Sequence, residues 1–191
     1  LPSRLTVLLA LRGGRPEGTA DRTVVHAPDR EAELDALFGT PSGVTSRPTL
    51  TVLRPGDPRL VPDADHEAIT LTSVVPARSG GSREDYVDLA EKLIAVAERA
   101  VPDLRERLLW HEVRTPADIA EATGAEGGAV PPPALAAGEG ALLHPANTTA
   151  LPGLFTVGGW SHPGGGLPHA GMSGALVAGL IVEGPEFRGS Q

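Results

Sequence analysis

Apolar and polar positions alternate along the first part of the chain. Residues 5–11 place leucine or valine at every second position, and Gly13 and Gly14 follow directly. A two-residue period is typical of a half-buried strand, and paired glycines favour a turn. Because few long helical patterns separate the strand-like segments, the sequence predicts an antiparallel sheet. Further short strands are predicted over residues 22–27, 50–53, 69–72 and 108–113.

A different period, with apolar residues at steps of three and four, marks residues 82–101. This spacing gives one apolar stripe along a helix. Ser82 is a suitable N-cap, and Pro102 is expected to end the helix because proline lacks the N–H that a helix interior needs. The same kind of start and stop signals predict two shorter helices, one over residues 29–38 and one from Thr115 to Gly124.

Residues 125–141 are rich in glycine, alanine and proline and include three consecutive prolines. Such a composition is typical of a connection between domains, because it forms little regular structure. We therefore expect one domain over residues 1–125 and a second segment over residues 126–191.

The most informative stretch follows this connection. Residues 154–157 form a short apolar run that predicts a buried strand, residues 158–168 form a glycine-dense loop, and a small-residue helix is expected from Gly171 to about Val182. Glycines allow backbone to approach a flat or anionic ligand, and a helix N-terminus offers free N–H donors. Glycine-rich loops also serve as plain tight turns, so composition alone leaves both interpretations open.

Two common nucleotide-binding motifs are absent from the sequence. The loop has no Gly-Lys-Ser/Thr, which a phosphate-binding P-loop requires. The chain also has no two-glycine dinucleotide fingerprint followed by an acid about 20 residues later. The sequence therefore lacks the elements that bind the pyrophosphate of a dinucleotide.

The order of residues from Leu154 to Pro168, followed by Gly171-Met172-Ser173-Gly174, resembles the C-terminal flavin motif of the phytoene desaturase (carotenoid dehydrogenase) family. In that family a strand ending in glycines precedes Thr/Ser-His-Pro-Gly-x-Gly-x-Pro and a helix that begins with Ser-Gly. Weaker similarity to the family extends over residues 22–38, 48–50, 57–58 and 115–118.

This resemblance implies an α/β fold, namely the C-terminal part of a two-domain FAD/NAD(P)-binding oxidoreductase. Residues 1–125 would form an incomplete substrate-binding domain, an antiparallel sheet with helices, and residues 126–191 would supply the last strand and helix of the FAD-binding domain. The expected partner is the missing N-terminal FAD-binding half, in the same gene or as a separate chain. The implied cofactor-binding residues are Gly158, Gly159, Trp160, His162, Pro163, Gly164, Gly165, Gly166, Leu167, Pro168, Met172 and Ser173.

The function that the resemblance implies is an FAD-dependent desaturase or dehydrogenase of carotenoid biosynthesis, with hydride transfer between an apolar isoprenoid-like substrate and the flavin. The isolated chain is expected to be inactive, and no catalytic side chain can be assigned. Two alternatives remain. One is a non-catalytic lipid- or protein-binding member of the same fold, similar to Rab GDP-dissociation inhibitors, and the other is a flavin amine oxidase.

Composition and charge argue against several kinds of partner and site. The net charge of −8 and the lack of a basic run argue against a nucleic-acid partner. The chain has no cysteine, and the six histidines show no zinc-type spacing, so no metal site is expected. No apolar run approaches the roughly 20 residues of a membrane-spanning helix. The expected location is the cytoplasm, and peripheral membrane contact and homo-oligomer formation remain open.

Three individual residues complete the sequence-based expectations. His162 lies inside the matched motif and is expected near the flavin, whereas a loop histidine bonded to backbone is the simpler alternative. Trp160 stands where many flavoproteins carry an acid, so its polar contact to the cofactor is in doubt. Asn147 begins a formal glycosylation triplet, which we interpret as a chance match.

Overall fold

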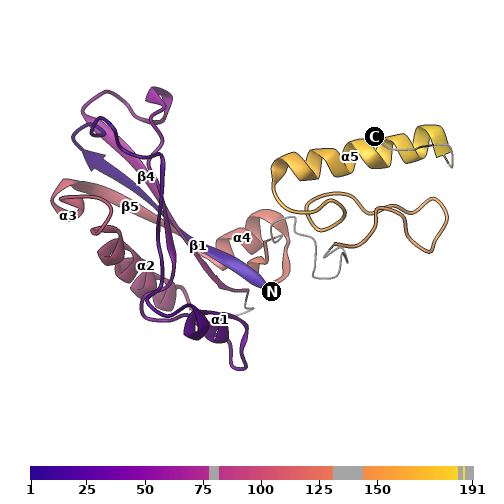
Figure 1. The fold of residues 1–191 in the computed structure, drawn as a ribbon, viewed down its shortest axis with the longest axis horizontal. Helices are drawn as coiled ribbons and strands as arrows, with labels where there is room; N and C mark the ends of the chain where they lie inside the picture. Colours follow the sequence, from indigo (N-terminus) through magenta and orange to yellow (C-terminus); the bar gives the residue numbers. More distant parts are fainter. Residues whose placement is uncertain (78–81, 131–143, 185–186, 188–191) are drawn as a thin grey trace. The chain divides into compact units, whose positions relative to one another are not determined.

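The computed structural model describes residues 1–77, 82–130, 144–184 and 187 (Figure 1). The chain divides into two compact units, residues 1–130 and residues 131–191. Most of the expected connection over residues 125–141 lies outside the described residues. The assignment of the first part to substrate binding and of the last part to an FAD-binding domain stays a prediction.

The first unit is built on one antiparallel sheet of five strands in the order β2-β3-β4-β1-β5. The predicted antiparallel sheet is therefore confirmed. β4 is much longer than the segment that the sequence predicted, because it pairs with β1 along the full length of both strands. The strands are β1 (Pro2–Arg12), β2 (Arg22–Val25), β3 (Leu50–Leu53), β4 (His66–Pro76) and β5 (Leu108–Arg114).

Two helices of this unit begin at the capping residues that the sequence indicated, Ser82 and Thr115, and a third is capped by Asp29, which the sequence pattern predicted as its first residue. Each of these side chains accepts a backbone N–H, and Thr115 and Asp118 form a complete capping box. The helices are α1 (Arg30–Phe38), α2 (Arg83–Ala97), α3 (Leu104–Arg107) and α4 (Pro116–Thr123), with 3-10 turns η1 (Pro58–Leu60) and η2 (Glu126–Gly128).

The end of α2 differs from the sequence-based expectation. The α-helix ends at Ala97 rather than at Val101, and the chain continues in hydrogen-bonded turns, in which the Ala97 carbonyl accepts the amides of Ala100 and Val101. Val101 is nevertheless fully buried. The apolar pattern therefore marked the buried stretch correctly but could not distinguish a helix from the turns that follow it.

Burial of one face of β1 and β4 under α2 forms the core of the unit (Figure 1). In the register of the two strands, Val7 lies opposite Leu71 and Leu9 lies opposite Ile69, so the apolar set of each strand points to the same face. Each fully buried leucine contributes about 2 kcal/mol. The residues of α2 that cover this face are Leu89, Ala90, Leu93, Ile94 and Ala97.

A buried ion cluster lies on the same face of the sheet. The Glu67 carboxylate, 3% exposed, receives a bidentate hydrogen bond from Arg54, with Nε to Oε1 at 2.7 Å and Nη2 to Oε2 at 3.1 Å. Arg107 Nη2 donates to Oε2 of Glu67 at 2.8 Å and also to the Gly13 carbonyl at 2.9 Å. Burial opposes ionisation of Glu67, but the hydrogen bonds and charges of both arginines outweigh it, so its pKa is held below its usual value.

The second unit contains the long helix α5 (Leu167–Glu183), preceded by loops over residues 144–166. The predicted buried strand over residues 154–157 is wrong. Among the described residues this segment forms only one bridge, between Phe155 and Thr148, and Leu154 and Val157 are 52% and 58% exposed. A strand needs a neighbour along its whole length for its N–H and C=O groups, and an apolar run does not supply one.

The helix of the second unit also begins earlier than predicted, at Leu167 rather than at Gly171. Proline is well accommodated in the first turn of a helix, where its missing N–H has no partner to lose, and Pro168 occupies that turn. Gly171, Met172 and Ser173 therefore lie inside the helix. None of the helices in the described parts of the chain is both long and apolar enough to cross a membrane.

We predict that Glu67→Gln lowers the free energy of unfolding by about 3 kcal/mol, because it leaves the buried Arg54 charge without its partner. The measurement is urea unfolding followed by circular dichroism. Glu112→Gln is the matched control, since the Glu112–Arg114 pair is exposed, and it should change stability by less than about 0.5 kcal/mol. Equal effects of the two substitutions would show that the cluster does not stabilise the fold.

We also predict a specific dependence of stability on pH. Because the pKa of Glu67 is lowered in the folded state, its contribution is fully present above the pKa of an unfolded glutamate, about 4.3, and is lost as pH falls through the folded-state value. The urea midpoint of the natural chain should therefore fall more steeply below about pH 4.5 than that of Glu67→Gln. Parallel pH profiles for the two proteins would contradict this assignment.

Candidate functional site

The glycine-dense loop over residues 158–166 is a compact turn that leads directly into α5. Gly158, Gly164 and Gly165 have φ values of 112°, 76° and 89°, a left-handed region that side chains other than glycine rarely adopt. The loop closes on itself, because the amide of Ser161 donates to the Gly158 carbonyl and the amide of Gly165 donates to the Gly159 carbonyl at 3.1 Å. These three glycines are therefore required by the shape of the loop itself.

The buried side chain of Asn147 anchors the loop. Its side-chain amide nitrogen lies 3.0 Å from the Thr156 carbonyl, 3.0 Å from the His162 carbonyl and 2.9 Å from Ser173 Oγ. The residue is only 7% exposed. One buried side chain thus connects the chain before the loop, the loop itself and α5.

Ser173 is the second centre of this hydrogen-bond network. Its hydroxyl is fully buried and, besides the bond from Asn147, accepts the Gly158 amide at 3.1 Å and lies 3.2 Å from Ser161 Oγ. Ser173 lies in the second turn of α5, so these bonds fix the start of the loop to the helix that ends it. Buried hydrogen-bond networks of this kind hold a segment in one arrangement.

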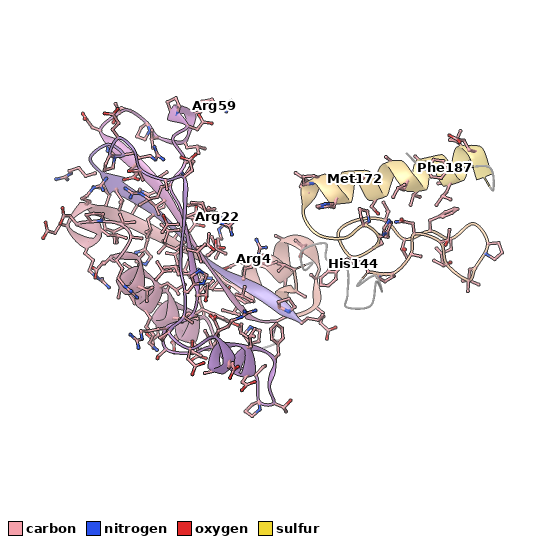
Figure 2. The ribbon with its side chains drawn as sticks, viewed as in Figure 1. Arg4, Arg22, Arg59, His144, Met172 and Phe187 are labelled. Atoms are coloured by element: carbon pink, nitrogen blue, oxygen red, sulfur yellow. The ribbon has the colours of Figure 1, made fainter. Side chains whose placement is uncertain are left out.

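His144 packs against the loop at Gly164. A Cβ atom on Gly164 would lie 1.9 Å from Cδ2 of His144, so only glycine fits at this position. His144 is 8% exposed, and its Nε2 has no hydrogen-bond partner within the described residues. Figure 2 labels this residue together with Met172, which lies on α5. Gly164 therefore serves the internal packing of the unit.

The predicted cofactor-binding residues fall into three groups by their exposure in the structure. Gly164, Gly165 and Ser173 are buried, and Gly158, Gly159, His162 and Pro163 are half-buried. His162 takes part in the network through its backbone, since its amide donates to the Pro145 carbonyl at 2.8 Å. The exposed members, which form the outer surface of the loop and the start of α5, are Trp160, Gly166, Leu167, Pro168 and Met172. Whether these residues bind a cofactor stays a prediction.

Sequence reasoning missed Asn147, Ser161 and His144 as parts of this site. Asn147 and Ser173 are 26 positions apart, and no spacing rule connects an asparagine in a loop with a serine inside a helix. The only sequence signal at Asn147 was the glycosylation-like triplet. Because the amide nitrogen of Asn147 is occupied by three acceptors in a buried position, the structure favours a structural role for it.

The start of α5 carries a partial positive charge that no side chain of its first turn compensates. The helix has no side-chain cap at Gly166 and no acidic residue in its first turn. The free N–H groups and the helix dipole therefore favour an anion or a partial negative charge at this end, by up to about 2 kcal/mol in partly buried geometry.

Comparison with known proteins finds similarity between this chain and part of several carotenoid-modifying enzymes. No family model matches it. A carotenoid 3,4-desaturase of Haloarcula japonica is 27% identical over 95% of this chain and 37% of the relative. A 4,4'-diapolycopene oxygenase of a Methylomonas species is 31% identical over 78% of the chain and 31% of the relative. A prolycopene isomerase of an Oncidium hybrid is 30% identical over 64% of the chain and 22% of the relative.

These matches confirm the resemblance to the C-terminal portion of phytoene desaturase-like enzymes. The relatives include a desaturase, an oxygenase and an isomerase, and the similarity supports an oxidoreductase-type function in carotenoid biosynthesis. The chain spans 37% of the length of the desaturase and less of the other two relatives. Activity, substrate and partners of the whole protein are therefore proposals.

We predict that Asn147→Ala loosens the loop without unfolding the first unit. The two amide hydrogens of Asn147 are shared among two backbone carbonyls and the buried Ser173 hydroxyl, so the substitution leaves buried acceptors without a donor, which costs about 2 kcal/mol. Amide hydrogen exchange of Ser161, His162 and Gly165 should accelerate by more than about tenfold. Thr149→Ala is the control, because the Thr149 hydroxyl bonds are exposed, and it should leave these rates nearly unchanged. Unaltered exchange in Asn147→Ala would contradict the network.

Proposed function

We propose that this chain is part of an FAD-dependent oxidoreductase of the desaturase or dehydrogenase type, in which the outer surface of the loop over residues 158–166 lies against the flavin. The observation that carries the proposal is Gly166, an exposed glycine whose backbone has an ordinary φ of −71°. A Cβ on Gly166 would meet only Pro168 Cδ, at 3.9 Å. The conformation of the loop therefore does not require a glycine here, and the space beside Gly166 is open to a flat ring.

The electrostatics of the site agree with this proposal. A flavin gathers negative charge at one edge of its ring on reduction, and the uncapped start of α5 favours negative charge through its free N–H groups. We propose that the first turn of α5 faces that edge. The network of Asn147 and Ser173 then fixes the position of the helix start relative to the loop, so both can contact one rigid ligand.

The reaction that we propose is hydride transfer between an apolar, isoprenoid-like substrate and the flavin. FAD, when bound, supplies the redox chemistry. The part of this chain is to orient the ring and to exclude water from one side of it. Names of relatives such as carotenoid 3,4-desaturase and 4,4'-diapolycopene oxygenase support a long apolar polyene as the substrate class.

We propose that the adenine, ribose and pyrophosphate of FAD are bound by a dinucleotide-binding half outside these 191 residues. The 191 residues contain no dinucleotide fingerprint, and such a fingerprint is what binds the pyrophosphate in this class of fold. That half lies in the same gene or in a separate chain. The 191-residue chain alone should be inactive, because it offers only the surface for the flavin ring.

The experiment that tests the proposal is Gly166→Val in the protein assembled with its dinucleotide-binding half. Gly166 has a negative φ and room for a side chain in this chain, so valine should clash only with a bound ring. We expect FAD retention, measured by flavin absorbance after gel filtration, to fall by more than about tenfold. Gly164→Val would be uninformative, because it collides with His144 even without a ligand.

The matched control is Gly171→Ala, which adds a Cβ in open space inside α5 and should retain flavin fully. Circular dichroism should show both variants folded. Undiminished yellow colour in Gly166→Val would place the flavin elsewhere. Tight stoichiometric binding of FAD to the 191-residue chain alone, measured by titration calorimetry, would contradict the proposed second half.

A further inference from the structure

A depression of about 460 Å³ lies where the loop over residues 39–49, between α1 and β3, passes along α2. Ser46 and Arg47 of this loop line one side of it, and the other side consists of the end of α2 and the turn that follows. The depression is on the solvent side of α2, because the opposite side of the helix packs on the sheet. It lies within the unit of residues 1–130, apart from the glycine loop of the other unit.

Three cationic side chains and no acidic side chain line this depression. They are Arg47, Lys92 and Arg99. None of the three forms an ion pair with another described residue. In a chain with a net charge of −8, such a local excess of positive charge favours an anion as the ligand.

The acids of α2 do not neutralise these cations. Glu91 and Glu98 both pair with Arg105, at N–O distances of 3.3 and 2.9 Å. Asp88 stands one turn before Lys92, a spacing at which opposite charges can pair, but the described residues show no ion pair between them. The neighbours that the helix offers therefore leave the positive charges uncompensated.

Lys92 and Arg99 project from the same side of the helix. Arg99 lies in a turn that continues α2, since its amide donates to the Val96 carbonyl at 3.2 Å. Seven residues are close to two full turns, so the two positions are aligned along the axis, about 10 Å apart. Between them lie Ala95, which is small and exposed, and the half-buried Val96. Both side chains are longer than one turn of the helix, so their charged groups can reach one ion above Ala95.

The loop brings the third cation to the same place. Arg47 and Arg99 together line an adjoining depression with His26, and Ser46 and Lys92 together line another. The loop therefore runs beside the helix with Arg47 next to Arg99 and Ser46 next to Lys92. Two separate contacts along the helix thus fix which loop residue meets which cation.

The same loop segment is anchored and carries hydroxyl groups. Pro48 is buried, and the amide and hydroxyl of Thr49 donate to the Glu33 carboxylate, so the chain after Arg47 is held in place. Ser46 lines the depression itself. The hydroxyl oxygen of Thr45 is buried and has no hydrogen-bond partner among the described residues. A buried hydroxyl without a partner costs free energy that a bond to a ligand oxygen would recover.

We propose that this depression binds a phosphate group, with Arg47, Lys92 and Arg99 around its oxygens. A phosphate monoester carries about −1.5 to −2 charges at pH 7, which balances three cations better than the single charge of a carboxylate does. Asp85 is the only acid that lines the two adjoining depressions, and it stands two turns before Lys92. One exposed cation is well solvated and holds an anion weakly, whereas several around one ion act together.

The phosphate belongs either to a soluble phosphomonoester or to the headgroup of a lipid, because both present the same oxygens. The flavin and the dinucleotide-binding half take no part in this binding. Failure of this proposal is therefore distinguishable from failure of the proposed function.

Titration of the 191-residue chain with glycerol 1-phosphate, followed by amide chemical shifts, tests the proposal. We expect saturable shifts at Ser46, Arg47 and residues 92–99, and binding of acetate at least about tenfold weaker at the same ionic strength. Arg47→Gln and Arg99→Gln should each weaken the binding of glycerol 1-phosphate by about tenfold, because each removes a charge-assisted hydrogen bond.

Arg4→Gln is the matched control. Arg4 is equally exposed and has no ion pair with a described residue, but it lies on β1, outside the depression. This variant should bind glycerol 1-phosphate as the natural chain does. An equal loss of affinity in Arg4→Gln would show that only the overall charge matters and would overturn the site.

Vesicles that contain phosphatidic acid distinguish the two sources of phosphate. Saturable binding of glycerol 1-phosphate assigns a soluble phosphomonoester. Binding to the vesicles alone, weakened by Arg47→Gln and Arg99→Gln but not by Arg4→Gln, assigns the headgroup of a lipid. The proposal is wrong if neither probe binds, or if the shifts occur away from the loop and α2.

Discussion

The two-residue period of β1, buried under α2, is the constraint on which the first unit depends. β1 pairs with β4 along its full length and with β5 on its other edge, so it fixes the register of both. A slip by one residue would turn Val7 and Leu9 to the opposite face and bring Thr6 and Leu8 under α2. The ion cluster of Glu67 depends on the same register, because Glu67 lies on the buried face of β4 only in this alignment.

The second unit is held by a different kind of interaction. The segment before α5 has only one strand-like bridge among the described residues. Its backbone is therefore held by hydrogen bonds to side chains, whereas strand pairing holds the backbone of the first unit. Asn147 and Ser173 together bind three backbone groups, those of Thr156, Gly158 and His162. A loop fixed in this way presents the same surface to any ligand and does not need the ligand for its shape.

The glycines of the loop, similar in sequence, have unlike physical roles. Gly164 is required by the His144 ring beneath it, and Gly158 by its positive φ, whereas Gly166 has ordinary backbone angles and free space beside it. A glycine that nothing in the chain itself requires is the one whose lack of a side chain most directly suggests a ligand. This difference separates the flavin proposal from the alternative of a plain tight turn.

The sequence by itself determined the existence of the five strands of the first unit, two of the helix caps and the family resemblance, because these depend on neighbouring residues and on local motifs. Ser82 and Thr115 cap their helices as expected, since a cap involves residues only three positions apart. Only the tertiary structure decided that residues 154–157 form no strand and that Asn147 meets Ser173. These features depend on pairing between distant segments, which no local pattern of residues encodes.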